Sequence, residues 1–267
     1  MRFASRSGYP VSAKCLAAWL RWRTSLSTAF FLGFLASFSV GYESHAASAW
    51  PERYNDCLGL DDPEEAIAAC MDALTSPALS VLERSEVFRE LGSLHRYAER
   101  LDAARFNLDA SLALVPESPE TLAELGAVLY LQDDFKGAEA ALSRAIAGNL
   151  PSGRAHNNRA MALLKLGKAD AALRDFDVAV RISETNGAIW NNRANALCST
   201  GNIEGAYNDR IQALYNGRFT AAAAQAGLKT SGFYDGPTDG IWGFDSEEAL
   251  RAWTAAGCPN APATRLQ

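Results

Sequence analysis

Small and apolar residues recur at a fixed step along residues 85–219 of the chain. Three series advance by 34 residues and stay in phase through four units. Their members are Gly92, Gly126, Ala160 and Ala194; Ala104, Ala138, Ala172 and Ala206; and Ser111, Ala145, Ala179 and Ala213. Three such series without an insertion indicate internal repeats of one structural unit. The sequence therefore predicts a repeat array over about half of the chain.

The residues around these small positions follow a known pattern, W-x2-L-G-x2-Y, then A-x3-F, then P. In the first unit these positions are Phe88, Leu91, Gly92, His95, Ala104, Leu108 and Pro116. The array resembles tetratricopeptide repeats, which implies an all-α solenoid of antiparallel helical hairpins. Small residues would let the two helices of a hairpin approach closely, and the third small series would face the next hairpin. We expect four repeats, at 85–118, 119–152, 153–186 and 187–218.

The N-terminus has the order of segments that is typical of a secretory signal peptide. Basic residues up to Arg23 precede an apolar run over 29–42, and small residues follow at Ser44-His45-Ala46 and Ala47-Ser48-Ala49. We expect a signal peptide over residues 1–47, hence a periplasmic or secreted protein with no stable membrane anchor after cleavage. The alternative is an uncleaved anchor, but the run is shorter than the roughly 20 residues that a spanning helix needs.

Four cysteines remain after the expected cleavage, and they allow three pairings. Cys57 and Cys70 lie on either side of the segment 61–65, Asp-Asp-Pro-Glu-Glu, which has the acidic cap and first-turn proline of a helix start. We predict a Cys57–Cys70 bond that staples a helical hairpin over 48–84 and caps the array, with free core thiols as the alternative. No metal site is expected, because the mature chain has two histidines and both occupy repeat core positions.

Asparagines mark the candidate binding surface of the array. Asn158 and Asn192 take the same place in successive repeats, and Asn195 lies one turn beyond Asn192. The resemblance implies that this face lines a concave groove, where amides could bind the backbone or carboxylate of a protein or peptide ligand. Alternatively, the three amides are solvated, or they belong to the Asn-Arg-Ala opening common in such repeats.

Two charged pairs occur in the last two repeats only. Arg159 precedes Asp175, and Arg193 precedes Asp209, by 16 residues in each case. This offset joins the two helices of one hairpin, so we predict structural ion pairs.

Beyond residue 218 the repeat step ends, and a turn-rich run follows over 232–243, Gly-Phe-Tyr-Asp-Gly-Pro-Thr-Asp-Gly-Ile-Trp-Gly. A helix ending near Lys229 would precede it, and a second helix would follow, capped by Asp245. This order resembles the small peptidoglycan-binding domain of bacterial wall proteins. We expect such a module over 219–258 and a tail over 259–267.

The resemblance assigns peptidoglycan contacts to four residues of this run. They are Tyr234, Asp235, Asp239 and Trp242. The alternative is structural: Trp242 is core, the aspartates form turns, and the module caps the solenoid. A Cys198–Cys258 bond, which we also expect, would tie the module to the last repeat and favour this alternative.

The charge and the motifs of the chain indicate which classes of function are not expected. The formal net charge is −6, and residues 1–46 carry five basic side chains but one acidic side chain, so the mature chain is more acidic still. Without a Lys/Arg run, it is not expected to bind nucleic acid. No G-x-S-x-G, H-E-x-x-H or phosphate-loop motif occurs, so we expect no catalysis and no cofactor. The sequence predicts a non-enzymatic exported adaptor, with a cell-wall remodelling enzyme of unrecognised catalytic residues as the alternative.

Overall fold

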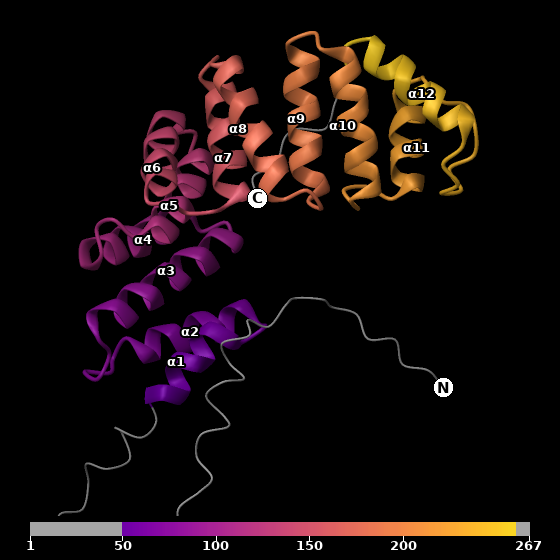
Figure 1. The fold of residues 1–267 in the computed structure, drawn as a ribbon. Coiled ribbons are helices and arrows are strands. Elements are labelled where there is room, and N and C mark those ends of the chain that lie inside the picture. Colours follow the sequence, from indigo (N-terminus) through magenta and orange to yellow (C-terminus); the bar gives the residue numbers. More distant parts are fainter. Residues whose placement is uncertain (1–49, 260–267) are drawn as a thin grey trace, which may run out of the picture. The chain divides into compact units, whose positions relative to one another are not determined.

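The computed structural model describes residues 50–259, in which every regular element is a helix (Figure 1). The predicted signal peptide and nearly all of the predicted tail lie outside these residues. The helices are α1 (Trp50–Gly59), α2 (Pro63–Ala73), α3 (Val81–Tyr97), α4 (Leu101–Leu114), α5 (Pro119–Leu131), α6 (Phe135–Ala147), α7 (Gly153–Lys165), α8 (Ala169–Ile182), α9 (Gly187–Ser199), α10 (Ile203–Tyr215), α11 (Ala221–Thr230) and α12 (Phe244–Ala255).

Consecutive helices pair into hairpins that stack in chain order. The pairs are α1 with α2, α3 with α4, α5 with α6, α7 with α8, and α9 with α10. The second helix of each hairpin packs on the first helix of the next. First helices also contact one another, α3 with α5, α5 with α7 and α7 with α9. The first helices therefore share one face of the array.

The glycines of the first helices explain the small-residue series. A Cβ atom on Gly92 would lie 2.5 Å from Leu108 Cγ, and one on Gly126 would lie 2.4 Å from Leu142 Cγ. Both distances are shorter than van der Waals contact, so a side chain at either position would require the facing leucine to move. The 34-residue period of small residues thus marks the points where the two helices of each hairpin lie closest together.

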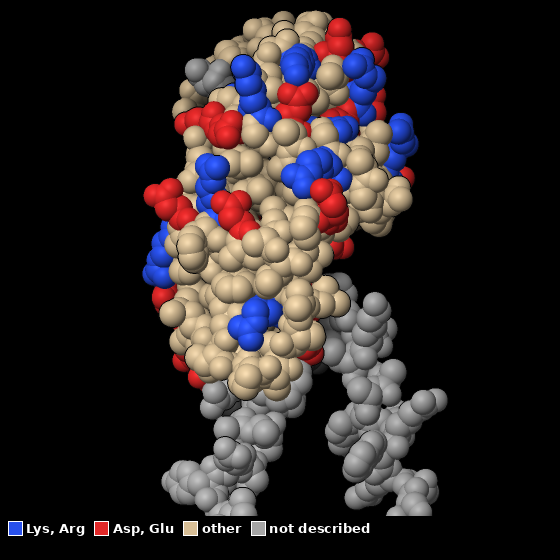
Figure 2. Space-filling model, turned by 90° about the vertical axis from the view of Figure 1, so that its left-hand side faces the viewer, with Lys and Arg blue, Asp and Glu red and all other residues tan. Residues whose placement is uncertain are grey.

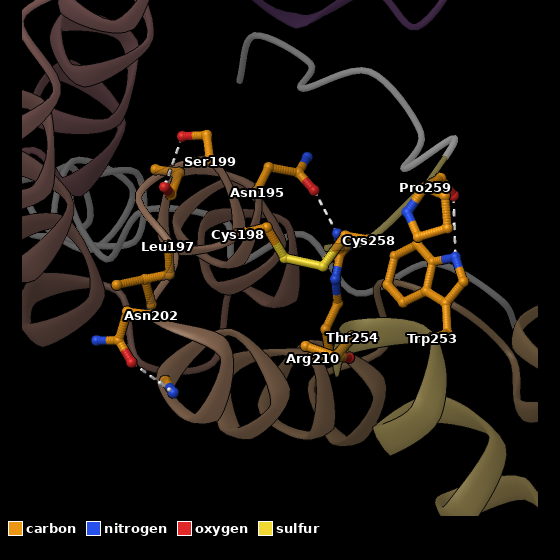
Figure 3. The surroundings of a disulfide bond; sticks show 12 residues. Asn195, Leu197, Cys198, Ser199, Asn202, Arg210, Trp253, Thr254, Cys258 and Pro259 are labelled. Atoms are coloured by element: carbon orange, nitrogen blue, oxygen red, sulfur yellow. Dashed lines mark hydrogen bonds between the residues drawn. A yellow bond between two sulfur atoms is a disulfide. The ribbon is translucent and has the colours of Figure 1, made fainter. Parts of the chain in front are cut away.

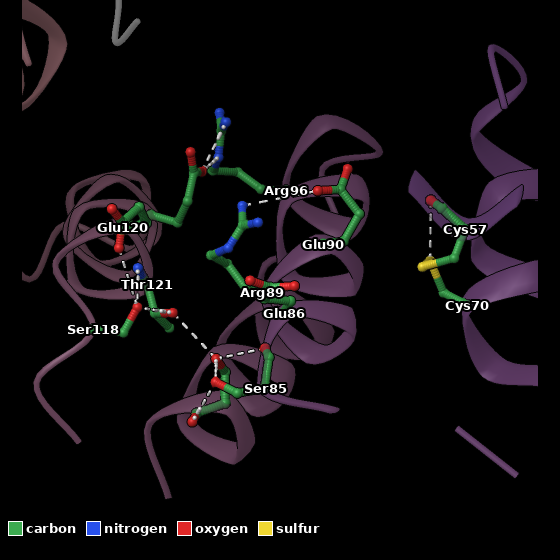
Figure 4. Close-up of polar contacts among 12 residues, drawn as sticks. Cys57, Cys70, Ser85, Glu86, Arg89, Glu90, Arg96, Ser118, Glu120 and Thr121 are labelled. Carbon is green, nitrogen blue, oxygen red and sulfur yellow. Dashed lines mark hydrogen bonds and ion pairs between the residues drawn. A yellow bond between two sulfur atoms is a disulfide. The ribbon is translucent and has the colours of Figure 1, made fainter. Parts of the chain in front are cut away.

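The third small series connects neighbouring hairpins, as the sequence predicts. Ser111 of α4 donates from its Oγ to the Ser85 carbonyl oxygen at 2.8 Å, and the same Oγ lies 3.1 Å from Thr121 Oγ1 of α5. Figure 4 shows Ser85 and Thr121 within this group of polar contacts. All three side chains are buried, so the hydrogen bonds remove the cost of desolvating their hydroxyls.

The N-terminal hairpin covers the open end of the first repeat. Asp62 accepts hydrogen bonds from the backbone N–H groups of Glu64 and Glu65, and Pro63 is the first residue of α2, as predicted for a helix start. Cys57 and Cys70 form a disulfide bond with their Cα atoms 4.4 Å apart. Both cysteines are buried, and they share one core with Val87 and Leu91 of α3.

The turn inside each repeat hairpin has one residue in the left-handed region, again at the 34-residue step. The four residues and their φ angles are Glu99 at 58°, Asp133 at 60°, Gly167 at 73° and Gly201 at 79°. Glycine adopts this conformation without strain, whereas a residue with a Cβ atom pays roughly 1–2 kcal/mol. The first two repeats therefore carry strain that the last two avoid.

We expect Glu99→Gly to raise the free energy of unfolding by roughly 0.5–1 kcal/mol, since the strain relieved exceeds the extra entropy of an unfolded glycine. Glu99 is exposed, so little packing is lost. Urea denaturation followed by circular dichroism measures the change. Gly167→Glu, the reverse substitution at the same turn position two repeats later, should lower the free energy of unfolding. Equal stability of Glu99→Gly and the parent protein would contradict the strain argument.

The C-terminal helices α11 and α12 dock on the last repeat. Cys198 of α9 and Cys258 form a disulfide bond with their Cα atoms 6.2 Å apart. Tyr207 of α10 donates from its hydroxyl to Glu247 of α12 at 2.6 Å. The predicted cap of α12 was wrong: the helix begins at Phe244 with Gly243 at the N-cap position, and no side chain caps it.

Candidate functional site: the first-helix face

The candidate site is the face along which α3, α5, α7 and α9 contact one another, named here the first-helix face. One position of the repeat supplies a polar residue to this face from every repeat. Its members are Glu90, Glu124, Asn158 and Asn192. The face is therefore acidic in the first two repeats and neutral and amide-rich in the last two.

In the acidic half of the face, arginines from neighbouring helices contact Glu124. Arg96 of α3 donates from Nε to Glu124 Oε2 of α5 at 3.1 Å, and Arg154 Nη1 of α7 lies 4.0 Å from Glu124 Oε1. Glu124 thus links three successive first helices. Burial raises the pKa of Glu90, and the nearby negative charge of Glu124 raises it further.

The amide half forms a continuous set of hydrogen bonds. Asn157 donates from Nδ2 to Asn158 Oδ1 at 3.0 Å, and Asn192 donates from Nδ2 to Asn157 Oδ1 at the same distance. Asn192 Nδ2 also lies 3.3 Å from Met161 Sδ. These contacts join α7 to α9 through side chains on the first-helix face.

The burial of the amides corrects one expectation about the groove. Asn158 and Asn192 are each 2% exposed, so they are interior groups that connect helices rather than an open surface for a ligand. Asn195 is half-buried and accepts a hydrogen bond from Arg210 of α10. The physical reason is that neighbouring first helices pack so closely that their facing amides satisfy one another.

Sequence reasoning missed the two carboxylates at the same repeat position. Glu90 and Glu124 precede Asn158 by two steps and one step of 34 residues. The two halves of the face differ in residue type, so a pattern of asparagines reveals only the last two repeats. Following the position instead of the residue type would have found all four.

The two predicted ion pairs are confirmed. Arg159 donates to both Asp175 oxygens, from Nε at 2.6 Å and from Nη2 at 2.7 Å, and Arg193 binds Asp209 with the same two distances. His156 Nδ1 lies 3.0 Å from Asp175 Oδ1. Each pair joins the two helices of one hairpin in bidentate geometry, which is the strongest arrangement of these groups.

The two aspartates differ in their surroundings. Burial would raise the pKa of Asp175, but the hydrogen bonds from Arg159 and His156 outweigh it and lower this pKa. Burial raises the pKa of Asp209, and the nearby negative charge of Asp177 raises it further, so the hydrogen bonds from Arg193 do not lower it. In this repeat Trp190 stands at the position of His156, so no histidine bonds to the aspartate.

We expect the Asp175 carboxyl to titrate below, and the Asp209 carboxyl above, the ordinary pKa of about 3.9. The Asp175 contribution to stability is therefore present above about pH 4 and is lost as the pH falls through its folded pKa. Carboxyl carbon NMR across pH 2–6 measures both values. His156→Ala should raise the Asp175 pKa and leave that of Asp209 unchanged. The reverse order of the two carboxyls would contradict this account.

In the C-terminal module, a buried glutamine organises the turn-rich run. Gln225 of α11 is 0% exposed. Its Nε2 donates to the Ile241 carbonyl oxygen at 2.9 Å and to Ser246 Oγ at 3.1 Å, and its Oε1 accepts from the Gly240 N–H at 3.0 Å. Asp239 accepts from the Ile241 N–H at 2.9 Å. This network shapes the loop between α11 and α12.

The four predicted peptidoglycan contacts are not on one surface. Tyr234 is 6% exposed and donates from its hydroxyl to the Pro237 carbonyl oxygen at 3.0 Å, so it is a core residue and the expectation of an exposed aromatic surface there is corrected. Asp235 is exposed beside an open hollow of about 400 Å³ that Asp245 and Glu248 also line. Trp242 instead lines a separate apolar cavity.

Charges of both signs are interspersed over the molecule. Figure 2 shows lysines and arginines next to aspartates and glutamates, without a continuous basic area on the face that it presents. Within residues 50–259, no group of three or more His, Cys, Asp or Glu side chains is arranged to hold a metal ion. In the same part of the chain, no helix combines the length and the apolar character needed to cross a membrane.

Comparison with known proteins identifies the repeat. The tetratricopeptide repeat family model matches residues 89–153 and 129–187. The chain therefore contains tetratricopeptide repeats, as the sequence predicts. No curated protein sequence matches the chain.

Solved structures with the same fold include MamA and Cut9. A MamA structure from Desulfovibrio magneticus is 16% identical with a TM-score of 0.55, and the match covers 66% of this chain and 97% of that chain. Another MamA structure is 21% identical with a TM-score of 0.52, covering 63% and 90%. A match to the APC/C hetero-tetramer Cut9–Hcn1 is 21% identical with a TM-score of 0.53, covering 58% of this chain and 30% of that chain. At these identities, the similarity concerns the fold.

Proposed function

We propose that this protein is a non-enzymatic, exported scaffold that binds a protein or peptide partner along the first-helix face. The observation that carries the proposal is the stacking of tetratricopeptide hairpins with their first helices on one face. Arrays of this kind present extended surfaces that suit protein binding. The four repeats over 85–218 supply this surface, and the hairpin over 48–84 covers one end.

The charges of the first-helix face indicate the chemistry of the partner. Glu124 is partly exposed, with 16% of its side chain accessible, and Arg154 beside it has 50% accessible. Arg154 can leave its 4.0 Å contact with Glu124 for a partner at little cost, because the Arg154 side chain is exposed, while Glu124 keeps the hydrogen bond from Arg96. The buried amides of α7 and α9 would keep the floor of this face rigid. We therefore assign first contact with the partner to the α5–α7 part of the face.

Site-specific photocrosslinking tests the binding surface. A crosslinking residue at position 154 on α7 should capture a defined protein in the native cell envelope. The matched control is position 105 on α4, where Arg105 also has 50% of its side chain accessible but lies on a second helix. Capture of the same protein from position 105, or of none from position 154, would refute binding at the first-helix face.

Two structural features support the proposed export to an oxidising compartment. The disulfide bonds Cys57–Cys70 and Cys198–Cys258 are both compatible with the fold, and such bonds persist in the periplasm or outside the cell. Fractionation of cells that express the full chain, followed by non-reducing peptide mapping, tests this part. Recovery in the cytoplasm with free thiols would contradict it.

Association with peptidoglycan is a second proposed property, supported by the resemblance of residues 232–243. Asp235 beside the open hollow is the polar group best placed to contact the wall. The protein should pellet with purified sacculi at low salt, and Asp235→Asn should reduce pelleting, while the matched variant Asp170→Asn, at an exposed position on α8, should not. Failure to pellet would leave the module as a cap on the repeats. Release of labelled fragments from the sacculi would instead favour a remodelling enzyme.

A further inference from the structure

Arg210 occupies a position that is apolar in the other three repeats. The residues at this position are Leu108, Leu142 and Phe176, each 0% exposed, followed by Arg210, which is 5% exposed. An arginine in a core position of a hairpin is costly unless its charge is compensated. Arg210 therefore needs an explanation that the packing of the repeat does not supply.

The guanidinium of Arg210 bonds to amides and lies over an aromatic ring, and the carboxylate of Asp209, whose charge acts on Arg210, forms its ion pair with Arg193 instead. Its Nη1 donates to Asn191 and its Nη2 donates to Asn195, both on α9, and its guanidinium carbon lies 5.0 Å from the centre of the Trp253 ring. Figure 3 shows Arg210 between Asn195 and Trp253, next to the Cys198–Cys258 bond. Across residues 50–259, no carboxylate forms an ion pair with this guanidinium, and Arg210 Nε has no hydrogen-bond acceptor.

Arg210 also lines a cavity of about 520 Å³ between α10, α11 and α12. Its apolar walls include Leu214, Phe219, Leu228 and Trp242. Trp242 Nε1 is a second buried donor without an acceptor. A cavity of this size with apolar walls and a few convergent polar groups is typical of small-molecule sites. Both unsatisfied groups are donors, so the complementary ligand carries an acceptor.

We propose that this cavity binds a small apolar carboxylate. The carboxylate pairs with the Arg210 guanidinium, and the hydrocarbon lies against Trp242 and Phe219. The anion supplies the direct ion pair that no carboxylate of residues 50–259 forms with this guanidinium.

The strength of this pairing follows from burial. Desolvation lowers the pKa of Arg210 to about 10, so the guanidinium stays protonated at neutral pH in surroundings that do not solvate its charge well. A carboxylate in such surroundings forms charge-assisted hydrogen bonds that are stronger than those in water. The neutral amides of Asn191 and Asn195 orient the guanidinium without neutralising it. Because the guanidinium keeps its positive charge, the cavity should bind an anion more tightly than a cation or a neutral analogue.

Calorimetric titration with sodium octanoate tests the proposal, with octanol and octylammonium as probes of the same chain length. Octanoate should bind about tenfold or more tightly than either analogue, the difference expected for one charge-assisted contact. Arg210→Leu restores the residue type of the first two repeats and should weaken octanoate binding about tenfold or more. Arg174→Leu on α8 is the matched control, because it removes one exposed positive charge outside the cavity.

A second variant protects the test against misfolding of Arg210→Leu. Gly227 of α11 lines the cavity, and a Cβ atom there would meet no other atom within 4 Å. Gly227→Leu should fill part of the cavity and weaken octanoate binding while leaving Arg210 in place. Equal affinity of octanoate for Gly227→Leu and the parent protein, or for a folded Arg210→Leu variant, would overturn the proposal, as would the absence of binding at about 10 mM. Arg210 would then serve only to hold Trp253.

Discussion

Replacement of Cys198 and Cys258 together by serine is expected to lower stability by about 4 kcal/mol, the loop-closure value for a bond of this separation. The two cysteines are 60 residues apart, and the bond closes a loop that contains α10, α11 and α12. Without it, the unfolded chain gains the entropy of that loop. The folded module would keep its contacts with α10, including the hydrogen bond from Tyr207 to Glu247.

Hydrogen exchange is the suitable measurement, because it reports the stability of each part of a repeat array separately. The amides of α11 and α12 should lose protection, while those of α3 to α6 should keep it. The matched control replaces Cys57 and Cys70, which are 13 residues apart. That variant should lose about 3 kcal/mol, in α1 and α2 only. Unchanged protection of α12 in the first variant would show that side-chain packing alone holds the module.

Gly187→Ala should lower the free energy of unfolding by about 2–3 kcal/mol, in the range for overpacked sites. A Cβ atom on Gly187 would lie 2.7 Å from the Ala213 carbonyl oxygen, 2.8 Å from the Asn216 carbonyl oxygen and 2.9 Å from the Arg218 nitrogen. All three are backbone atoms, so no side chain can rotate away. The start of α9 would have to separate from the end of α10.

Thermal unfolding followed by circular dichroism measures this effect. Gly227→Ala is the control: its Cβ atom would meet open space, and alanine favours helix over glycine by up to about 1 kcal/mol. That variant should be as stable as the parent protein or more so. If Gly187→Ala were equally stable, the close approach of α9 and α10 would not be a requirement of the fold.

The repeat fold could be predicted because its signal is local and periodic. Glycine or alanine recurs wherever two helices of a hairpin meet, and Gly92 and Gly126 show the steric reason directly. The pair Arg159–Asp175 and the pair Arg193–Asp209 could also be predicted, since an offset of 16 residues spans one hairpin. These features depend on neighbouring elements alone.

The backbone conformation of the turn residues could be predicted in only two of the four repeats. Gly167 and Gly201 mark such turns in the last two repeats, but Glu99 and Asp133 take the same conformation without a glycine to mark it. Their strain is tolerated because the helices on both sides are held by packing. Propensity at a single position does not reveal this.

By itself, the sequence determined the repeat unit, its helical pairing and the ion pairs inside each hairpin, because each follows from spacing along one short stretch. Only the tertiary structure decided what the polar residues do. Asn158 and Asn192 are buried between helices because two first helices pack against each other. Tyr234 is a core residue because the loop that contains it packs on Gln225. Arg210 lies beside an apolar cavity because the last repeat meets α11 and α12 instead of another repeat. Burial depends on which surfaces meet, and spacing along the chain does not specify that.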